Sequence, residues 1–444
     1  MTKLRHSYII PVAGLGLILI GVILIGLSTL PDGAATALPL VGPAPTSTPV
    51  PTRTPEPLIP TRTSTPTPAP TKAPASPTST REPSITSTAE VAMPLPPTPI
   101  PETPTDVPTA LPTENTPAAT ATVAPTLTPT ALPSADFNVP PGERFRLGVS
   151  IPYGASSSQI VDVLAALEVG WVMDWAVRAA PLLPPGVEYA QSVRFRSGVL
   201  SPEAATLTAV AAARPGSLWL ISNEPDVRWQ DNVTPEVYAR LYHEAYTAIK
   251  AGDPGAVVVA GGIAQPSDLR HRYLERALTA YHANYGASLP AQAWHIHNYM
   301  LREERDTWGV DIPPGLPDDT GVLYGVDDSG NLAAFRAQIY EFRRWMAAHG
   351  YAGQPLIVSE FGVPMPPDYG FSEARMAEFL RETWYFFLTA TDPALGDPTD
   401  GGRLVQRWCW FSLGFPDYPT GNLIDLETGT WTPFGETWLS YVRD

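Results

Sequence analysis

Short apolar runs alternate with longer amphipathic stretches through the C-terminal two-thirds of the chain. Between the runs, an apolar position recurs every three or four residues, as in 234–250, where Pro235 suits the first turn of a helix, and in 332–349, which ends before Gly350. Strand and helix alternating eight times predict an α/β fold, a (β/α)8 TIM barrel, with its active site at the C-terminal ends of the strands. The predicted strands are residues 146–151, 171–177, 188–195, 218–221, 256–260, 293–300, 356–359 and 405–411.

The N-terminal apolar run is of a different kind. Residues 9–30 carry no charge, and Lys3 and Arg5 precede them. A helix of about 20 apolar residues spans the hydrocarbon layer of a membrane, and basic residues favour the cytoplasmic side. The pattern therefore predicts a single-pass transmembrane anchor in the cell membrane, with everything after it extracellular. The alternative is a signal peptide cleaved after Ala37, which would give a secreted protein.

Residues 31–135 contain no Phe, Trp or Tyr and repeat Pro, Thr, Ser and Ala in short units. Such a segment cannot bury enough apolar surface to offset the entropy lost on ordering, and proline favours extended conformations. We therefore expect a disordered Pro/Thr/Ser-rich linker. The predicted organisation is a cytoplasmic tip and anchor over 1–30, a linker over 31–138 and a barrel domain over 139–444.

Composition excludes several function classes. Cys409 is the sole cysteine, so neither an intrachain disulfide nor a zinc site built on several cysteines is possible. The formal net charge is −16, and no basic run is interleaved with aromatic residues. Nucleic acid is therefore not expected as a partner. We expect a monomer that needs no cofactor and holds no metal.

Two glutamates follow two of the predicted strands. Glu224 comes just after residues 218–221, and Glu360 comes just after 356–359. Side chains alternate along a strand, so both glutamates are expected to point into the mouth of the barrel. A pair of carboxylates on different strand ends is what cleavage of a glycosidic bond needs. Taken alone, the Asn223-Glu224-Pro225 segment could instead be the start of a helix, with Asn223 or Glu224 as the cap of its first turn.

The sixth predicted strand carries polar side chains on one face. His295, His297 and Tyr299 alternate along it, which is unusual for a strand that only fills a core. His297 and Tyr299 are therefore expected near the glutamates. The two histidines could instead be metal ligands or hydrogen-bonded core residues. Residues 301–330, which follow this strand, are charged and rich in Pro and Gly, so they predict a long loop on the catalytic face.

These motifs resemble a known group of enzymes. Asn-Glu-Pro at 223–225, His-Asn-Tyr at 297–299, Glu360 and the tryptophans Trp408 or Trp410 occur in the order seen in the retaining glycoside hydrolases of clan A. Within that clan, GWVMDW at 170–175, NEPD at 223–226 and SEF at 359–361 are similar to the alkali-sensitive-linkage-protein type of catalytic core, which includes the family 128 endo-β-1,3-glucanases. The resemblance covers most of residues 145–444.

The resemblance implies a role for each matching residue. Glu224 would be the acid/base and Glu360 the nucleophile of a double displacement that retains the configuration of the sugar. Asn223 would bind the sugar 2-hydroxyl, Tyr299 would contact Glu360, and Trp410 would stack under a sugar ring. His297 and Trp175 complete the set of expected substrate-binding residues, although residues 174–178 have no clear family pattern.

The expected substrate is a polysaccharide or oligosaccharide, in particular a β-glucan such as β-1,3-glucan. Two other functions remain open. A non-catalytic barrel could hold a glycan at the cell surface, for which an anchor and a long spacer would be equally suitable. A transglycosidase could pass the glycosyl group to another sugar instead of water, because both reactions share the first half-reaction.

Overall fold

The computed structural model describes residues 137–152 and 158–443. The predicted anchor and all but the last two residues of the predicted 31–138 linker lie outside these residues. Among the helices that the structure describes, none is long and apolar enough to cross a membrane.

Nine parallel strands form one sheet, in the order β3-β2-β1-β9-β8-β7-β6-β5-β4. Its two edges, β3 and β4, are consecutive pieces of one stretch of chain separated by Ala190, so the sheet curls into a nearly closed barrel. The Ala190 amide donates to the Val172 carbonyl at 2.9 Å, while β4 pairs with β5. The third predicted strand is thus present but divided. The strands are β1 Leu147–Ser150, β2 Trp171–Met173, β3 Glu188–Tyr189, β4 Gln191–Val193, β5 Leu218–Ile221, β6 Val257–Ile263, β7 Ala293–His297, β8 Leu356–Phe361 and β9 Arg407–Trp410.

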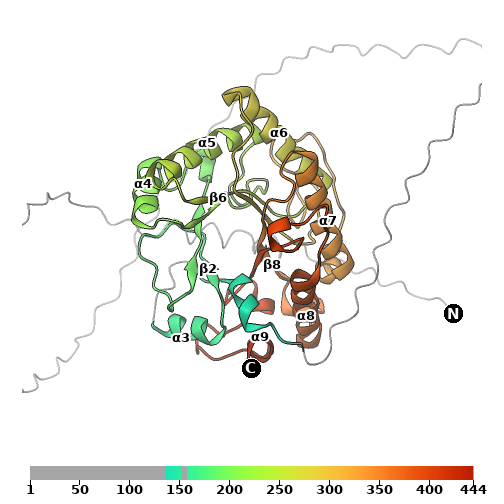
Figure 1. The fold of residues 1–444 in the computed structure, drawn as a ribbon. Coiled ribbons are helices and arrows are strands. Elements are labelled where there is room, and N and C mark those ends of the chain that lie inside the picture. Colours follow the sequence, from blue (N-terminus) through green and yellow to red (C-terminus); the bar gives the residue numbers. More distant parts are fainter. Residues whose placement is uncertain (1–136, 153–157, 444) are drawn as a thin grey trace, which may run out of the picture. The chain divides into compact units, whose positions relative to one another are not determined.

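Helices surround the strands, as Figure 1 shows. The two helices singled out in the sequence are confirmed. Thr234 precedes α5, with Pro235 in its first turn, and the Asn331 side chain caps α7 by accepting from the amides of Ala333 and Ala334. The α-helices are α3 Ser158–Ala166, α4 Ala204–Ala213, α5 Pro235–Gly252, α6 Asp268–Tyr285, α7 Leu332–Ala348, α8 Glu373–Thr389 and α9 Pro433–Val442.

The predicted alternation fails at one place. β2 leads to β3 through residues 174–187, and no α-helix lies between them. Pro181, Pro184 and Pro185 interrupt this segment. Because proline lacks the amide proton that an interior helical hydrogen bond needs, the segment stays irregular. This part of the barrel mouth is therefore built by a loop, which carries Trp175.

The apolar core has two layers. A large layer lies between the strands and the helices, and it holds most of the aromatic side chains. A smaller layer fills the inside of the barrel with Trp171, Met173, Ala190, Leu218, Leu220, Val259, Ala293, Ile357 and Cys409. Above this inner layer, at the C-terminal strand ends, the inward side chains become polar.

Candidate active site

The two predicted glutamates meet at the C-terminal end of the barrel. Glu224 follows β5 by three residues, and Glu360 is the fifth residue of β8. Their side chains are 12 % and 6 % exposed. One carboxylate oxygen of Glu224, one of Glu360 and one ring nitrogen of His297 all lie within 4.8 Å of one another. The structure thus brings together carboxylates that are far apart in the sequence.

His297, the last residue of β7, lies between the two carboxylates. Its Nδ1 is 3.1 Å from Glu224 Oε1, and its Nε2 is 3.4 Å from Glu360 Oε1. Burial alone lowers the pKa of His297, but the charges of Glu360 and Glu224 and the hydrogen bond with Glu224 raise it overall. The imidazolium form is therefore favoured between the two acids.

His295, two residues earlier, has a different environment. Its Nδ1 is 2.9 Å from Ser359 Oγ, and its Nε2 is 3.3 Å from the carbonyl oxygen of Ile221. Burial lowers the pKa of His295 to about 3, so the ring is neutral. Of the two interpretations left open for His295, the hydrogen-bonded core residue is the one that the structure supports.

Glu360 accepts hydrogen bonds from two aromatic side chains. Trp175 Nε1 donates to Oε1 at 2.6 Å, and the Tyr299 hydroxyl donates to Oε2 at 3.1 Å. Burial raises the pKa of Glu360; His297 and the two donors lower it, while Glu224 adds to the increase, and the net direction is upward. The expected contact between Tyr299 and Glu360 is present, and Trp175 also lies at the site.

The turn that carries Glu224 has an unusual backbone. Ser222 and Glu224 adopt φ angles of 71° and 47°, in the left-handed region that non-glycine residues seldom occupy. Asn223 lies between them and is 5 % exposed. Within the described residues, the Asn223 side chain has no hydrogen-bond partner.

The stacking role expected of Trp410 is wrong. Trp410 is fully buried, and its ring packs against Phe361 and Phe434 at centroid distances of 5.2 and 5.1 Å. Its Nε1 donates to the carbonyl of Gly421 at 2.7 Å. Cys409 lies in the inner layer, so alternation turns Trp410, like Trp408, towards the helices. A sugar ring cannot reach it.

Other aromatic residues cluster around Trp175, which contacts Glu360. Phe411 directly follows β9, two residues after the inward-facing Cys409, and its ring centroid lies 5.9 Å from that of Trp175. Phe415 and Tyr418 extend the cluster, at 5.3 and 5.8 Å from Phe411. Sequence reasoning missed these three residues, although alternation from Cys409 would have indicated Phe411. We call Trp175, Phe411, Phe415 and Tyr418 the aromatic wall.

The long loop predicted over residues 301–330 lies between β7 and α7, and buried charges fasten it to the barrel. Glu303 is fully buried and forms an ion pair with Arg270, whose Nε lies 2.6 Å from Asp226 Oδ2. Glu303 also accepts from the hydroxyl of Ser267 at 2.5 Å and the amide of Val322 at 2.9 Å. One guanidinium thus holds two carboxylates, and burial raises the pKa of Asp226 to about 6.

Glu224, His297 and Glu360 are also the group of described residues whose donor atoms could hold a metal ion. One imidazole and two carboxylates are ligands that zinc accepts. However, the two ring nitrogens of His297 face different carboxylates, Nδ1 towards Glu224 and Nε2 towards Glu360, and Nδ1 is hydrogen-bonded to Glu224. The expectation that no metal takes part stays a prediction.

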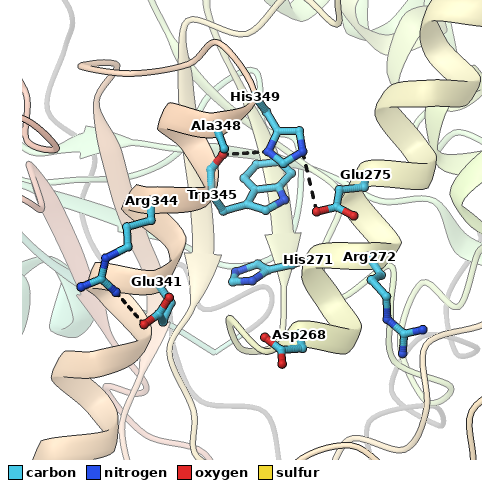
Figure 2. Close-up of a pocket in the computed structure, with 9 residues that line it drawn as sticks. All are labelled: Asp268, His271, Arg272, Glu275, Glu341, Arg344, Trp345, Ala348 and His349. Carbon is cyan, nitrogen blue, oxygen red and sulfur yellow. Dashed lines mark hydrogen bonds and ion pairs between the residues drawn. The ribbon is translucent and has the colours of Figure 1, made fainter. Parts of the chain in front are cut away.

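A separate groove of about 740 Å³ lies on the flank of the barrel, between α6 and α7 (Figure 2). Two ion pairs lie within the groove. His349 Nε2 is 3.7 Å from Glu275 Oε1, and Arg344 Nη1 is 2.5 Å from Glu341 Oε1. Glu224, His297, Glu360 and the aromatic wall do not line it. The groove is therefore distinct from the candidate active site.

No protein-family model matches this chain, and neither does any curated protein. Solved structures do match, and they include glycoside hydrolases of family 128, the family that the sequence motifs resemble. A subgroup I endo-β-1,3-glucanase from Amycolatopsis mediterranei in complex with laminaripentaose is 20% identical, with 67% of this chain and 99% of that chain covered and a TM-score of 0.46.

Two further matches come from other subgroups. A subgroup II endo-β-1,3-glucanase from Pseudomonas viridiflava is 18% identical, with 67% of this chain and 98% of that chain covered and a TM-score of 0.46. A subgroup III curdlan-specific exo-β-1,3-glucanase from Blastomyces gilchristii in complex with glucose is also 18% identical, with the same coverage and a TM-score of 0.43.

Proposed function

We propose that this chain is a retaining glycoside hydrolase that cleaves a β-glucan, with β-1,3-glucan as the substrate class that its sequence motifs suggest. The observation that carries the proposal is that one oxygen of Glu224 and one oxygen of Glu360 lie within 4.8 Å of each other at the ends of barrel strands. Retaining enzymes hold their carboxyl groups roughly 5 to 5.5 Å apart, whereas inverting enzymes need roughly 6.5 to 9.5 Å to admit a water molecule between acid and base. The short separation favours retention.

Glu360 is the nucleophile in this proposal. Its carboxylate attacks the anomeric carbon, the bond to the leaving oxygen breaks, and a glycosyl ester forms on Glu360. The indole of Trp175 and the hydroxyl of Tyr299 hold both carboxylate oxygens, so the direction of attack is fixed before substrate arrives.

Glu224 is the acid/base. It is the more exposed of the two carboxylates and hydrogen-bonds through one oxygen to His297. In the first step Glu224 donates its proton to the leaving oxygen. In the second step it takes a proton from water, whose oxygen attacks the ester and releases the sugar with its original configuration. The ring of His297 lies between the two carboxyl groups, where its charged form would offset the negative charge of the ionised Glu360.

The remaining parts of the mouth would bind the sugar. Asn223, the residue before Glu224, would hydrogen-bond a hydroxyl group of the sugar, as the resemblance implies. The aromatic wall lies beside Glu360 and offers apolar ring surface to the less polar faces of sugar rings.

The proposed place of action is the outer surface of the cell. This part of the proposal rests on the sequence, in which residues 9–30 form an uncharged apolar run behind Lys3 and Arg5. A membrane anchor followed by a Pro/Thr/Ser-rich spacer would hold the barrel away from the membrane, within reach of an extracellular polysaccharide.

The test is an activity screen of the full chain in detergent against β-1,3-glucan, mixed-linkage glucan, cellulose, xylan and mannan. Release of reducing ends from a β-glucan by the wild type, with none from Glu224→Gln or Glu360→Gln, would support the proposal. Products longer than the substrate would indicate transglycosylation. Binding of glucan by all three proteins with no release of reducing ends by any of them would instead support a glycan-binding barrel.

A further inference from the structure

Asp231 lies in the segment between Glu224 and α5, and nothing in the sequence singles it out. Its side chain is fully buried. Oδ1 accepts from Arg194 Nε at 2.7 Å, while Oδ2 accepts from the Phe195 amide at 2.8 Å. Oδ2 also accepts from the Ser222 hydroxyl and the Asn223 amide, both at 3.0 Å. One carboxylate therefore contacts the ends of both β4 and β5.

These contacts continue the barrel wall beyond the point where the strands part. The last bond between the two strands runs from the Ser222 amide to the Val193 carbonyl, at 2.8 Å. Beyond it, the amides of Phe195 and Asn223 have no carbonyl partner across the gap, and Asp231 Oδ2 accepts from both. Since buried amides need acceptors, the carboxylate takes the place of a missing strand bond.

The segment that Asp231 holds carries the reacting groups. The left-handed conformations of Ser222 and Glu224 are unfavourable for residues with a side chain, and they persist only where surrounding contacts impose them. On the far side, the Glu224 amide donates to the Gly262 carbonyl at 2.7 Å. The turn is thus fixed from β4 by Asp231 and from β6 by Gly262.

The geometry points to Asp231 as a positioning residue for the glycosidase proposed above. Asp231 holds Ser222 and Glu224 in their left-handed conformations, which keeps the Glu224 carboxyl at the leaving oxygen. Asp231 does not touch the substrate, because it is buried beneath the turn. The predicted effect of Asp231 on the reaction rate rests on the proposed function. Its predicted effect on the position of Glu224 does not.

The chain offers a matched control in Asp253. This aspartate, at the C-terminal end of α5, also accepts from two backbone amides, those of Gly216 and Gly255, at 2.7 and 2.8 Å. Like Asp231 it is buried, with 8 % of its surface exposed. It precedes β6 and so lies at the opposite end of the barrel from the glutamates. Asp253→Asn removes a comparable carboxylate without touching the site.

The first measurement compares two substrates in the full chain. In Asp231→Asn, kcat/KM for the β-glucan should fall about 10- to 100-fold, because a displaced acid no longer reaches the leaving oxygen. For an aryl glycoside with a dinitrophenolate leaving group, which departs without a proton, kcat/KM should fall less than about threefold. Asp253→Asn should lower Tm and leave both values near those of the wild type. Equal losses on the two substrates in Asp231→Asn would overturn the positioning role.

The second measurement does not depend on activity. His297 Nδ1 lies 3.1 Å from Glu224 Oε1, so displacement of Glu224 should lower the pKa of His297. NMR titration of labelled histidine reports this value, and His297→Gln assigns the signal among the seven histidines of the chain. A lower midpoint in Asp231→Asn but not in Asp253→Asn is expected. An unchanged midpoint would overturn the inference even if the wild type hydrolyses no glycan.

If Asp231→Asn does not fold, Ser222→Ala replaces it in both measurements. This change removes a single one of the four contacts to the carboxylate. It should shift the substrate ratio and the His297 midpoint in the same directions by smaller amounts, and a shift in neither would count against the role of Asp231.

Discussion

The indole of Trp175 offers the sharpest test of how the nucleophile is held. Trp175→Phe removes the N–H that donates to Glu360 Oε1 at 2.6 Å. It keeps an aromatic ring that can still pack on Phe411 and Phe415, whose centroids lie 5.9 and 6.1 Å from the indole. The substitution therefore removes one hydrogen bond and little of the packing.

The size of the effect follows from the charge of the acceptor. A hydrogen bond to a charged group contributes about 1.5 to 3 kcal/mol, and one pH unit corresponds to about 1.4 kcal/mol. The donor stabilises the ionised form of Glu360, so its loss should raise the pKa of Glu360 further. We expect the acidic limb of the kcat/KM profile to move to higher pH by about one to two units, with a loss of about 10- to 100-fold on that limb.

The assay measures kcat/KM from acid to neutral pH for the wild type, Trp175→Phe and Trp410→Phe. The third protein is the matched control, since the Trp410 indole donates to the Gly421 carbonyl on the outside of the barrel. The acidic limb of the Trp410→Phe profile should keep its position. Any effect of this substitution should be a lower stability of the protein. An acidic limb that stays in place in Trp175→Phe, or that moves equally in both variants, would refute the assignment of Glu360 as the nucleophile held by Trp175.

Two further predictions concern buried charge and metal. The pKa of Asp226 is raised to about 6 by burial, so Asp226 stabilises the fold below its ordinary pKa and loses that contribution as the pH rises through 6. Asp226→Asn mimics the protonated acid. In urea unfolding at pH 4.5 and 7.5 it should remove a pH-dependent loss on the order of 2 kcal/mol. The same pH dependence in both proteins would contradict this origin. EDTA should leave the hydrolysis rate unchanged, since the proposed steps use carboxyl groups alone, whereas inactivation reversed by Zn²⁺ would show that Glu224, His297 and Glu360 hold a metal.

Much of the site could be predicted because parallel strands impose simple rules. Alternation and the common direction of the strands placed Glu224, Glu360 and Tyr299 on the inward face at one end of the barrel, and the structure brings them together there. The strands themselves were recognised from short apolar runs, because strands buried on both faces are apolar throughout.

Other features could not be predicted from the same rules. Trp408 and Trp410 lie two residues apart and share a face, but spacing alone does not say whether that face is the inner or the outer one. The packing of Trp410 against Phe434 of α9 decides it. Asp231 was missed because it lies in an irregular segment, where no periodicity relates a side chain to the ends of β4 and β5.

The direct test of the central claim is mass spectrometry of Glu224→Ala after mixing with a dinitrophenyl β-glucoside or laminaribioside. The good leaving group departs without a proton, but no base activates water, so a glycosyl ester should accumulate. Retention predicts a peptide heavier by one glycosyl group, with the added mass on Glu360. A glycosyl group on another residue, or none on a protein whose wild type is active, would contradict the two-glutamate mechanism.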